Sequence, residues 1–273
     1  MKIYTAGGEL AFSTFRFPDG QPHFKLETYE REFNTVTIET RITSPNDLFD
    51  VALVNDVLRR AGYNTVNLDI LYLMGARMDR AISWAEPFTL QLIANFINQL
   101  GFTKVRILDA HSVVATNLIR HTENILPTQI VTGIVETLGQ PIIVCPDAGA
   151  RDRVVKMCHK WNIANAIKKR DPNTGQLSGF ELIDPSFVRG KNCLIVDDIC
   201  DGGGTFIGLI EVLKRSGAEK IYLFTTHGIY SKGTVGLVQA GFEKLYTTNS
   251  FRDSQDGLTK VVIIPVNMRN FGG

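Results

Sequence analysis

The sequence predicts an α/β protein in which mostly parallel sheets are covered by helices. Apolar, β-branched runs alternate with helix-like patterns along the 273 residues. Glycine follows several of the helix-like segments, as at Gly62, Gly101 and Gly217, and glycine commonly ends a helix. Segments 93–108 and 210–224 also share the order helix, glycine turn, charged residue and strand. This similarity fits a duplicated α/β domain, and common helix–strand punctuation is nearly as good an explanation.

The individual elements are predicted from these patterns, in chain order. Strands are predicted at His23–Glu27, Thr35–Arg41, Thr65–Leu73, Lys104–Asp109, Pro141–Cys145, Asn192–Val196, Lys220–Thr225, Lys244–Tyr246 and Lys260–Pro265, with a further strand-like stretch at Asn162–Ile167. Helices are predicted at Asp47–Ala61, Pro87–Leu100, Thr128–Leu138, Ala148–Lys160, Thr205–Arg215 and Thr234–Ala240. A boundary near residues 138–141 would give two domains of similar length, residues 1–139 and 140–273.

The composition is that of an ordinary globular protein, with 44% hydrophobic residues, 21% charged residues and a net charge of +1. A nearly neutral chain gives no support for a nucleic-acid partner. No run approaches eighteen consecutive apolar residues, and residues 1–8 lack the core of a signal peptide, so we expect no membrane partner. The scattered cysteines form no Cys-x-x-Cys pair, which favours reduced thiols in a cytoplasmic protein. These cysteines are Cys145, Cys158, Cys193 and Cys200.

The most informative motif lies at residues 194–206, where an apolar strand leads into three carboxylates and a glycine-rich turn. Its candidate site residues are Asp197, Asp198, Asp201, Gly202, Gly203, Gly204 and Thr205. Glycines let backbone N–H groups approach a phosphate, and the helix that begins behind the turn favours an anion. The carboxylates can accept hydrogen bonds from ribose hydroxyls or hold a divalent cation. A plain acidic strand–turn–helix junction is the alternative, but the motif favours a sugar-phosphate site.

Charged residues also follow two predicted strands of the first half, at the sheet edge where α/β proteins bind ligands. Arg77 and Arg80 follow the strand that ends at Leu73, and planar guanidinium groups suit a polyphosphate. Asp109 and His111 follow the next strand and could ligate a cation together. A solvated loop and a structural histidine are the alternative interpretations of these two segments.

The motif at residues 194–206 resembles the phosphoribosyl-pyrophosphate (PRPP) motif that type I phosphoribosyltransferases share with PRPP synthetases. Other segments resemble the ribose-phosphate pyrophosphokinase (PRPP synthetase) family in particular, and they occur in the family's order. These segments are Phe17–Gln21, Tyr72–Arg80, Asp109–His111, Pro146–Gly149, Thr226–His227 and Thr248–Ser250. The resemblance implies two similar phosphoribosyltransferase-type (type I) α/β domains, each a mostly parallel sheet flanked by helices.

The resemblance also implies a reaction, in which the pyrophosphoryl group of ATP is transferred to the anomeric hydroxyl of ribose 5-phosphate, giving PRPP and AMP. In the family the glycine turn holds the 5-phosphate, and residues at the positions of Asp197 and Asp198 bind the ribose hydroxyls. The residues implied to bind ATP are Phe17, Asp19, Gln21, Arg77 and Met78. In the family the loop that matches the first three is lent by a neighbouring subunit, so a homo-oligomer is expected. His111 and Asp147 are implied to be ligands of Mg²⁺, and His111 is also an implied catalytic residue.

A basic cluster, Lys168, Lys169 and Arg170, precedes a polar stretch suited to a loop. In the family, a lysine and an arginine two residues later stabilise the transition state. Lys168 and Arg170 have this spacing and are the predicted catalytic pair. An alignment without gaps to the following proline selects Lys169 instead, and it puts Asp171 in the arginine position. We favour Lys168, because an acid facing the transferred phosphate would be repelled.

Two positions depart from the family pattern: Gln21 replaces the usual glutamate and Met78 replaces the usual glutamine. Both positions contact adenine or its ribose in the family, so nucleotide selectivity is open. A type I phosphoribosyltransferase is a second hypothesis, but it explains only the motif at residues 194–206. A catalytically silent regulatory subunit is a third, which loss of the basic pair or of the metal ligands would have favoured. The expected partners are therefore ATP, ribose 5-phosphate and further copies of this chain.

Overall fold

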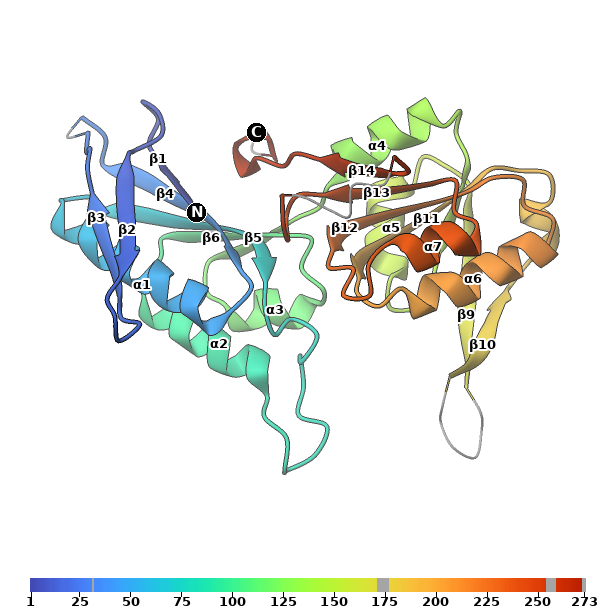
Figure 1. Cartoon of the computed structure of the whole chain (residues 1–273), viewed down its shortest axis with the longest axis horizontal. Helices are drawn as coiled ribbons and strands as arrows, with labels where there is room; N and C mark the ends of the chain where they lie inside the picture. Colours follow the sequence, from blue (N-terminus) through green and yellow to red (C-terminus); the bar gives the residue numbers. More distant parts are fainter. Residues whose placement is uncertain (31, 171–176, 254–258, 272–273) are drawn as a thin grey trace. The chain divides into compact units, whose positions relative to one another are not determined.

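The computed structural model describes residues 1–30, 32–170, 177–253 and 259–271. The chain divides into two compact units. Unit 1 comprises Met1–Ile125 together with the C-terminal residues from Met268, and unit 2 comprises Leu126–Asn267. Each unit has its own sheet and its own hydrophobic core (Figure 1). Among the described residues, no helix combines the length and apolar character needed to cross a bilayer.

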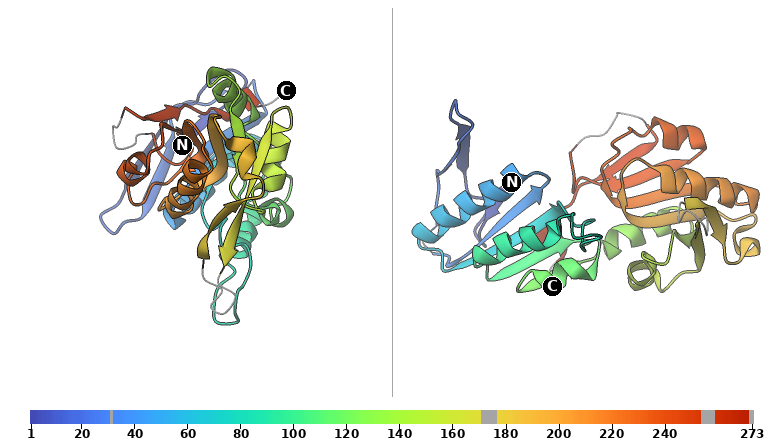
Figure 2. Two further views of the ribbon diagram at one scale, coloured as in Figure 1. Left: turned by 90° about the vertical axis from the view of Figure 1, so that its right-hand side faces the viewer. Right: turned by 90° about the horizontal axis from the view of Figure 1, so that it is seen from below.

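Unit 1 is built on a five-stranded sheet in the order β1-β4-β5-β6-β7. The strands are β1 (Lys2–Tyr4), β4 (Thr35–Ile42), β5 (Thr65–Leu73), β6 (Lys104–Leu108) and β7 (Thr122–Ile125). Only β1 runs antiparallel within this sheet. A separate antiparallel hairpin, β2 (Phe12–Arg16) and β3 (Pro22–Leu26), extends away from the sheet of unit 1 (dark blue in Figure 2).

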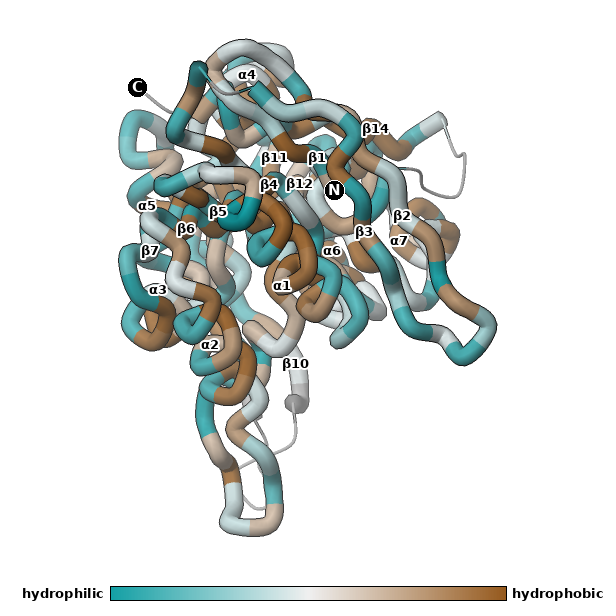
Figure 3. The backbone as a smooth tube through the Cα atoms, turned by 90° about the vertical axis from the view of Figure 1, so that its left-hand side faces the viewer, coloured by the Kyte–Doolittle hydropathy of each residue, from teal (hydrophilic) through white to brown (hydrophobic). Residues whose placement is uncertain are grey.

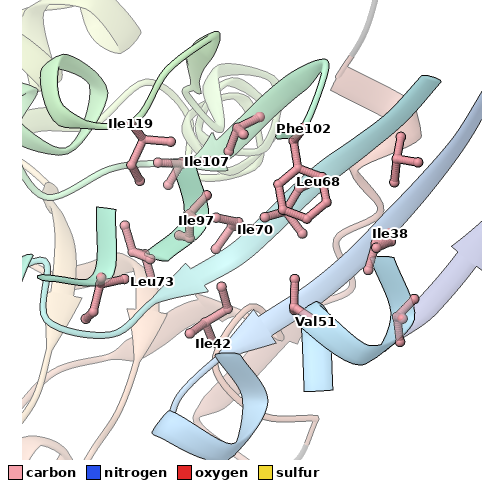
Figure 4. Packing of buried hydrophobic residues seen from close by; sticks show 14 of the residues in the cluster. Ile38, Ile42, Val51, Leu68, Ile70, Leu73, Ile97, Phe102, Ile107 and Ile119 are labelled. Atoms are coloured by element: carbon pink, nitrogen blue, oxygen red, sulfur yellow. The ribbon is translucent and has the colours of Figure 1, made fainter. Parts of the chain in front are cut away.

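Three helices accompany this sheet: α1 (Pro45–Arg60), α2 (Thr89–Gln99) and α3 (Val113–Leu118). A capping box formed by Ser44 and Asp47 begins α1 and satisfies backbone N–H groups at its first turn. Hydrophobic and hydrophilic residues alternate along α1 and α2 (Figure 3). Each helix can therefore bury its hydrophobic face. Figure 4 shows Ile97 of α2 packed with Ile70 and Ile107 from neighbouring strands. This packing holds the carboxyl ends of β5 and β6 side by side.

Unit 2 is built on a seven-stranded sheet in the order β10-β9-β8-β11-β12-β13-β14. The strands are β8 (Ile142–Cys145), β9 (Ile163–Arg170), β10 (Leu177–Leu182), β11 (Cys193–Cys200), β12 (Ile221–Gly228), β13 (Lys244–Thr248) and β14 (Val261–Ile264). All neighbouring strands are parallel except β9 and β10, which form an antiparallel hairpin beyond β8. The carboxyl ends of six strands therefore meet at one edge of the sheet.

Helices cover both faces of the unit 2 sheet. The helical elements are α4 (Thr128–Thr137), α5 (Arg151–Cys158), α6 (Gly204–Arg215), α7 (Val235–Ala240) and the short 3-10 turn η1 (Pro185–Val188). Successive residues of β11 pack into different cores, because side chains along a strand alternate between faces. Ile195 packs with Leu209 of α6, whereas Leu194 packs with Val154 of α5. The α/β fold with mostly parallel, helix-flanked sheets is thus confirmed.

The division between the units differs from the predicted boundary at residues 139 and 140. Helix α4 belongs to unit 2, because Val131 and Val135 pack in the same core as Ile143 of β8. The C-terminal residues belong to unit 1 instead. The 3-10 turn η2 (Met268–Phe271) begins with the Met268 N–H donating to the Glu39 carboxylate at 2.8 Å. The Arg269 guanidinium next to it lies 3.7 Å from the centre of the Tyr4 ring.

Candidate functional site

The carboxyl edge of the unit 2 sheet brings together candidate residues that are far apart in the sequence. Asp147 follows β8, Lys168 lies in β9, and Asp197 and Asp198 lie in β11. These three strands are adjacent and parallel, so their ends are adjacent as well. Ligands of α/β proteins bind at this edge.

Asp197 and Asp198 share one cation, the guanidinium of Arg153 on α5. Arg153 donates a short hydrogen bond to Asp197 Oδ1, and its Nη2 lies 3.1 Å from Asp198 Oδ1. The Asp198 N–H also donates to Asp197 Oδ1 at 2.9 Å. Burial raises the pKa of Asp197 well above its ordinary value, and the adjacent charge of Asp198 adds to this effect against the opposing charge of Arg153. The Arg153 guanidinium thus favours the charged form of Asp197, and burial opposes it.

The glycine turn after β11 has the backbone geometry expected of an anion-binding loop. Gly203 has φ 78°, a left-handed conformation that favours glycine, and it immediately precedes α6. A Cβ on Gly203 would also lie 3.2 Å from Leu237 of α7. The first N–H groups of α6 have no partner within the helix, as at every helix N-terminus. Asp201, Gly202, Gly204 and Thr205 accompany Gly203 in this turn, so the structure gathers the whole predicted motif at one helix start.

Asp147 and Lys168 form an ion pair at the same edge, with 2.5 Å between Lys168 Nζ and Asp147 Oδ2. Burial by itself raises the pKa of Asp147, but the hydrogen bond and charge of Lys168 and the Ala150 and Gly149 N–H groups outweigh it. The pKa of Asp147 is therefore lowered. The Ala150 N–H donates to Asp147 Oδ1 at 3.0 Å, which fixes the carboxylate over the start of α5.

Lys169 lies on the opposite face of β9 from Lys168. Its ammonium is 2.7 Å from Glu181 of β10, and both side chains are about half exposed. Lys168 is paired in register with Phe180 of β10. Arg170 is the last residue of β9. The side chain of Arg170 and all of residues 171–176 lie outside the described part of the structure.

The candidate nucleotide residues of unit 1 lie on two exposed segments. Phe17, Asp19 and Gln21 form the turn between β2 and β3, where the Gln21 N–H donates to Asp19 Oδ1 at 3.0 Å. Phe17 stacks edge-on against Phe15 with 4.8 Å between ring centres. Arg77 follows β5 in a turn closed by the Met78 N–H, which donates to the Gly75 carbonyl at 2.9 Å, and both Arg77 and Met78 are exposed.

His111 follows β6 and is exposed, two residues after the buried Asp109. Asp109 has φ 44°, an uncommon conformation for a residue other than glycine, and the next N–H, that of Ala110, donates to Asn124 Oδ1 at 2.8 Å. The strand end is therefore sharply bent before His111. His111 belongs to unit 1 and Asp147 to unit 2. Within the residues that the structure describes, no group of three or more His, Cys, Asp or Glu side chains forms a ready-made metal centre.

Comparison with known proteins shows which proteins this chain resembles. Residues 123–239 match the phosphoribosyl transferase domain family. The ribose-phosphate pyrophosphokinase of Pyrococcus furiosus is 29% identical over 256 residues, covering 92% of this chain and 88% of that protein. The enzyme of the same name from Vibrio parahaemolyticus is 29% identical and covers 84% of this chain and 74% of its own length. This chain is therefore similar to ribose-phosphate pyrophosphokinases over most of its length.

The fold of the chain is similar to that of one solved structure. The crystal structure of phosphoribosylpyrophosphate synthetase from Mycobacterium smegmatis superposes with a TM-score of 0.79 and 20% sequence identity, covering 94% of this chain and 86% of that chain. The matched domain family begins in β7 and ends in α7, so it spans the sheet edge that carries Asp147, Lys168 and Asp197.

Two side chains at the carboxyl edge of the unit 2 sheet were not among the predicted site residues. Arg153 could have been found from the sequence, since it follows the Pro146–Gly149 segment by one helical turn and carries a charge that offsets neighbouring carboxylates. Lys232 approaches the glycine turn from the loop between β12 and α7. No pattern in the sequence marks Lys232, because a single exposed lysine in a loop is common.

Proposed function

We propose that this protein is a ribose-phosphate diphosphokinase, which transfers the pyrophosphoryl group of ATP to the anomeric hydroxyl of ribose 5-phosphate and releases AMP. The observation that carries the proposal is the carboxyl edge of unit 2. There the motif from Asp197 to Thr205 leads from β11 into the start of α6. The ion pair between Lys168 and Asp147 joins two adjacent strands at the same edge. Relatives named ribose-phosphate pyrophosphokinase over most of the chain support the same reaction.

Ribose 5-phosphate is proposed to bind with its phosphate in the turn from Asp201 to Thr205. Backbone N–H groups at the start of α6 donate to phosphate oxygens, and the helix dipole favours the negative charge. Asp197 and Asp198 accept hydrogen bonds from the ribose hydroxyls. Arg153 holds both carboxylates in place for this task, since it contacts each of them. The sugar is thereby oriented before the reaction begins.

Lys168 is proposed to act on the transferred group. Phosphoryl transfer depends mainly on positioning and on neutralising charge on the transferred phosphorus oxygens. The Lys168 ammonium lies at the sheet edge beside Asp147, whereas Lys169 is turned away toward Glu181. This difference supports Lys168 over Lys169, and Arg170 is proposed as its partner two residues later. The Asp147 carboxylate holds the ammonium in place until the phosphates enter.

His111 and Asp147 are proposed to hold Mg²⁺. His111 is also proposed to act near the reacting phosphates. The carboxylate of Asp147 is an oxygen donor of the kind that Mg²⁺ prefers, and Mg²⁺ sites commonly use one or two protein ligands plus substrate phosphates. When bound, the ion would neutralise charge on the pyrophosphate. Arg77 and Met78 are proposed to contact the ATP phosphates. Phe17, Asp19 and Gln21 are proposed to contact the adenine of ATP. The working form is proposed to be a homo-oligomer in the cytoplasm.

The test is separation of nucleotides by chromatography after incubation of the full chain with ATP, Mg²⁺ and ribose 5-phosphate. We expect AMP to form only when ribose 5-phosphate is present, and ribose to be a poor replacement. Formation of ADP, or of no product by a folded protein, would overturn the proposal. In that case PRPP with a panel of nucleobases would test the transferase alternative. If this chain formed no product but increased the activity of an active relative, it would be a regulatory subunit.

A further inference from the structure

Lys232 lies against the glycine turn that follows β11. It is an exposed residue of the loop that joins β12 to α7. The three heavy atoms nearest to a Cβ built on Gly202 all belong to Lys232: Cδ and Cε at 3.6 Å and Cγ at 3.9 Å. The methylene stem therefore runs along Gly202, and the ammonium nitrogen is one bond beyond Cε.

The loop that carries Lys232 is attached to the strand end that carries the turn. The N–H groups of Ile229 and Tyr230 both donate to the Cys200 carbonyl, at 2.9 and 3.0 Å. Tyr230 is buried with φ 46°, and its carbonyl accepts from the Gly233 N–H at 2.9 Å. On the other side of the turn, Leu237 of α7 packs against Gly203. These contacts hold the base of Lys232 at a fixed place beside residues 201–204.

The glycine turn is close to several acidic residues. Asp197, Asp198 and Asp201 are all within a few residues of it, and Arg153 is engaged with Asp197 and Asp198. A phosphate dianion that enters the turn therefore approaches several negative charges. Backbone N–H groups and a helix N-terminus supply only partial positive charge, equivalent to about half of an elementary charge. A full positive charge beside Gly202 would offset the repulsion.

We propose that Lys232 is part of the anion site, where its ammonium binds the phosphate of the phosphorylated sugar and makes the site prefer ribose 5-phosphate to ribose. This proposal rests on the proposed function, because it assumes that a sugar phosphate occupies the turn. Lys232 lies at the phosphate end of the substrate, away from the anomeric carbon, so it contributes to binding and selectivity. Its contribution does not involve the transferred group.

The test is isothermal titration calorimetry of the full chain with ribose 5-phosphate, on wild type and three variants. Lys232→Met keeps the apolar stem and removes the charge, and we expect the Kd for ribose 5-phosphate to rise about five- to tenfold. Lys232→Arg keeps a cation and should stay within about twofold of wild type. Lys244→Met is the matched control, since Lys244 is an exposed lysine at the amino end of β13, the opposite edge of the sheet. We expect it to have no effect.

The outcomes separate this inference from the proposed function. Unchanged ribose 5-phosphate affinity in Lys232→Met, or an equal loss in Lys244→Met, would overturn the role of Lys232 even if the enzyme makes AMP normally. A selective loss in Lys232→Met would support the anion site even if the wild-type chain failed to turn over ATP. Failure of the wild-type chain to bind ribose 5-phosphate at all would overturn both.

Discussion

Lys168 and Asp147 form an ion pair across two adjacent parallel strands, with 2.5 Å between the ammonium nitrogen and the carboxylate oxygen. Asp147 follows β8, and Lys168 lies near the carboxyl end of β9. Both side chains are partly exposed, at 30% for Lys168 and 23% for Asp147. The ammonium is therefore held at the sheet edge yet remains accessible to an incoming phosphate.

This relationship predicts different effects for the two neighbouring lysines. Lys168→Ala should lower kcat by about a hundredfold, because removal of one group that stabilises transition-state charge has an effect of this size. The KM for ribose 5-phosphate should change much less. Lys169→Ala is the matched control and should keep kcat within about twofold, since Lys169 pairs with Glu181 on the other face of β9. A larger effect of Lys169→Ala in steady-state kinetics would contradict the assignment.

A second prediction concerns the cation shared by Asp197 and Asp198. Arg153→Gln should lower the free energy of unfolding by about 3 kcal/mol, because it removes the cation that contacts two adjacent, largely buried carboxylates. Adding Asp197→Asn should recover part of this loss, since only one carboxylate then remains. Urea denaturation of the two single variants and the double variant measures the coupling. Strictly additive effects would mean that Arg153 does not act through these carboxylates.

Gly228, the last residue of β12, gives a third prediction. A Cβ at this position would lie 2.6 Å from Thr247 Oγ1 and would also overlap the Tyr230 ring. Gly228→Ala should therefore destabilise the protein by about 1–3 kcal/mol through overpacking. Gly236→Ala on α7 is the control, because nothing lies within 4 Å of its Cβ position and alanine favours a helix. Thermal unfolding should show a lower Tm for the first variant only; equal Tm values would argue against the packing described.

The pH dependence of stability gives a fourth prediction, at Glu39 in unit 1. Burial raises the pKa of Glu39 above its ordinary value of 4.5; the Met268 N–H hydrogen bond opposes this, and the charge of Asp69 adds to it. Between 4.5 and the raised pKa the folded state binds more protons than the unfolded state. The free energy of unfolding contributed by Glu39 therefore falls as the pH rises through this window.

Glu39→Gln removes this titration and retains an oxygen for the Met268 N–H. Relative to wild type, the variant should gain stability as the pH is raised from about 4.5 to 7. Urea midpoints measured across this range test the sign. Glu136→Gln, at an exposed position of α4, is the control and should follow wild type. A variant that instead lost stability relative to wild type with rising pH would mean that the pKa of Glu39 is lowered by folding.

The sequence was most informative where buried strands and glycine turns coincide. Strands β8, β11 and β12 were predicted because each begins with a continuous apolar run, as expected of parallel strands covered on both faces. Strands β2 and β7 were not predicted, since they are short, polar and largely exposed. The residue pattern alone predicts a solvated basic turn at residues 168–170. In the structure β9 continues to Arg170, because β10 pairs with it as a hairpin.

Pairings between distant segments could not be read from residue patterns. Arg153 and Asp197 are 44 positions apart, and their contact follows only from the place of α5 over β11. The membership of α4 in unit 2 depends on which core its apolar face enters, and that face would suit either sheet. Lys232 has no local signature, and its place beside Gly202 depends on the two hydrogen bonds that its loop donates to Cys200.

The most direct test of the proposed reaction is a ³¹P NMR time course of the full chain with ATP, Mg²⁺ and ribose 5-phosphate. Attack of the anomeric hydroxyl on the β-phosphorus predicts that the three ATP signals are replaced by AMP and by a pair of diphosphate doublets from PRPP. Appearance of ADP with a second ribose monophosphate signal would mean that only the terminal phosphoryl group is transferred. That result would contradict the account.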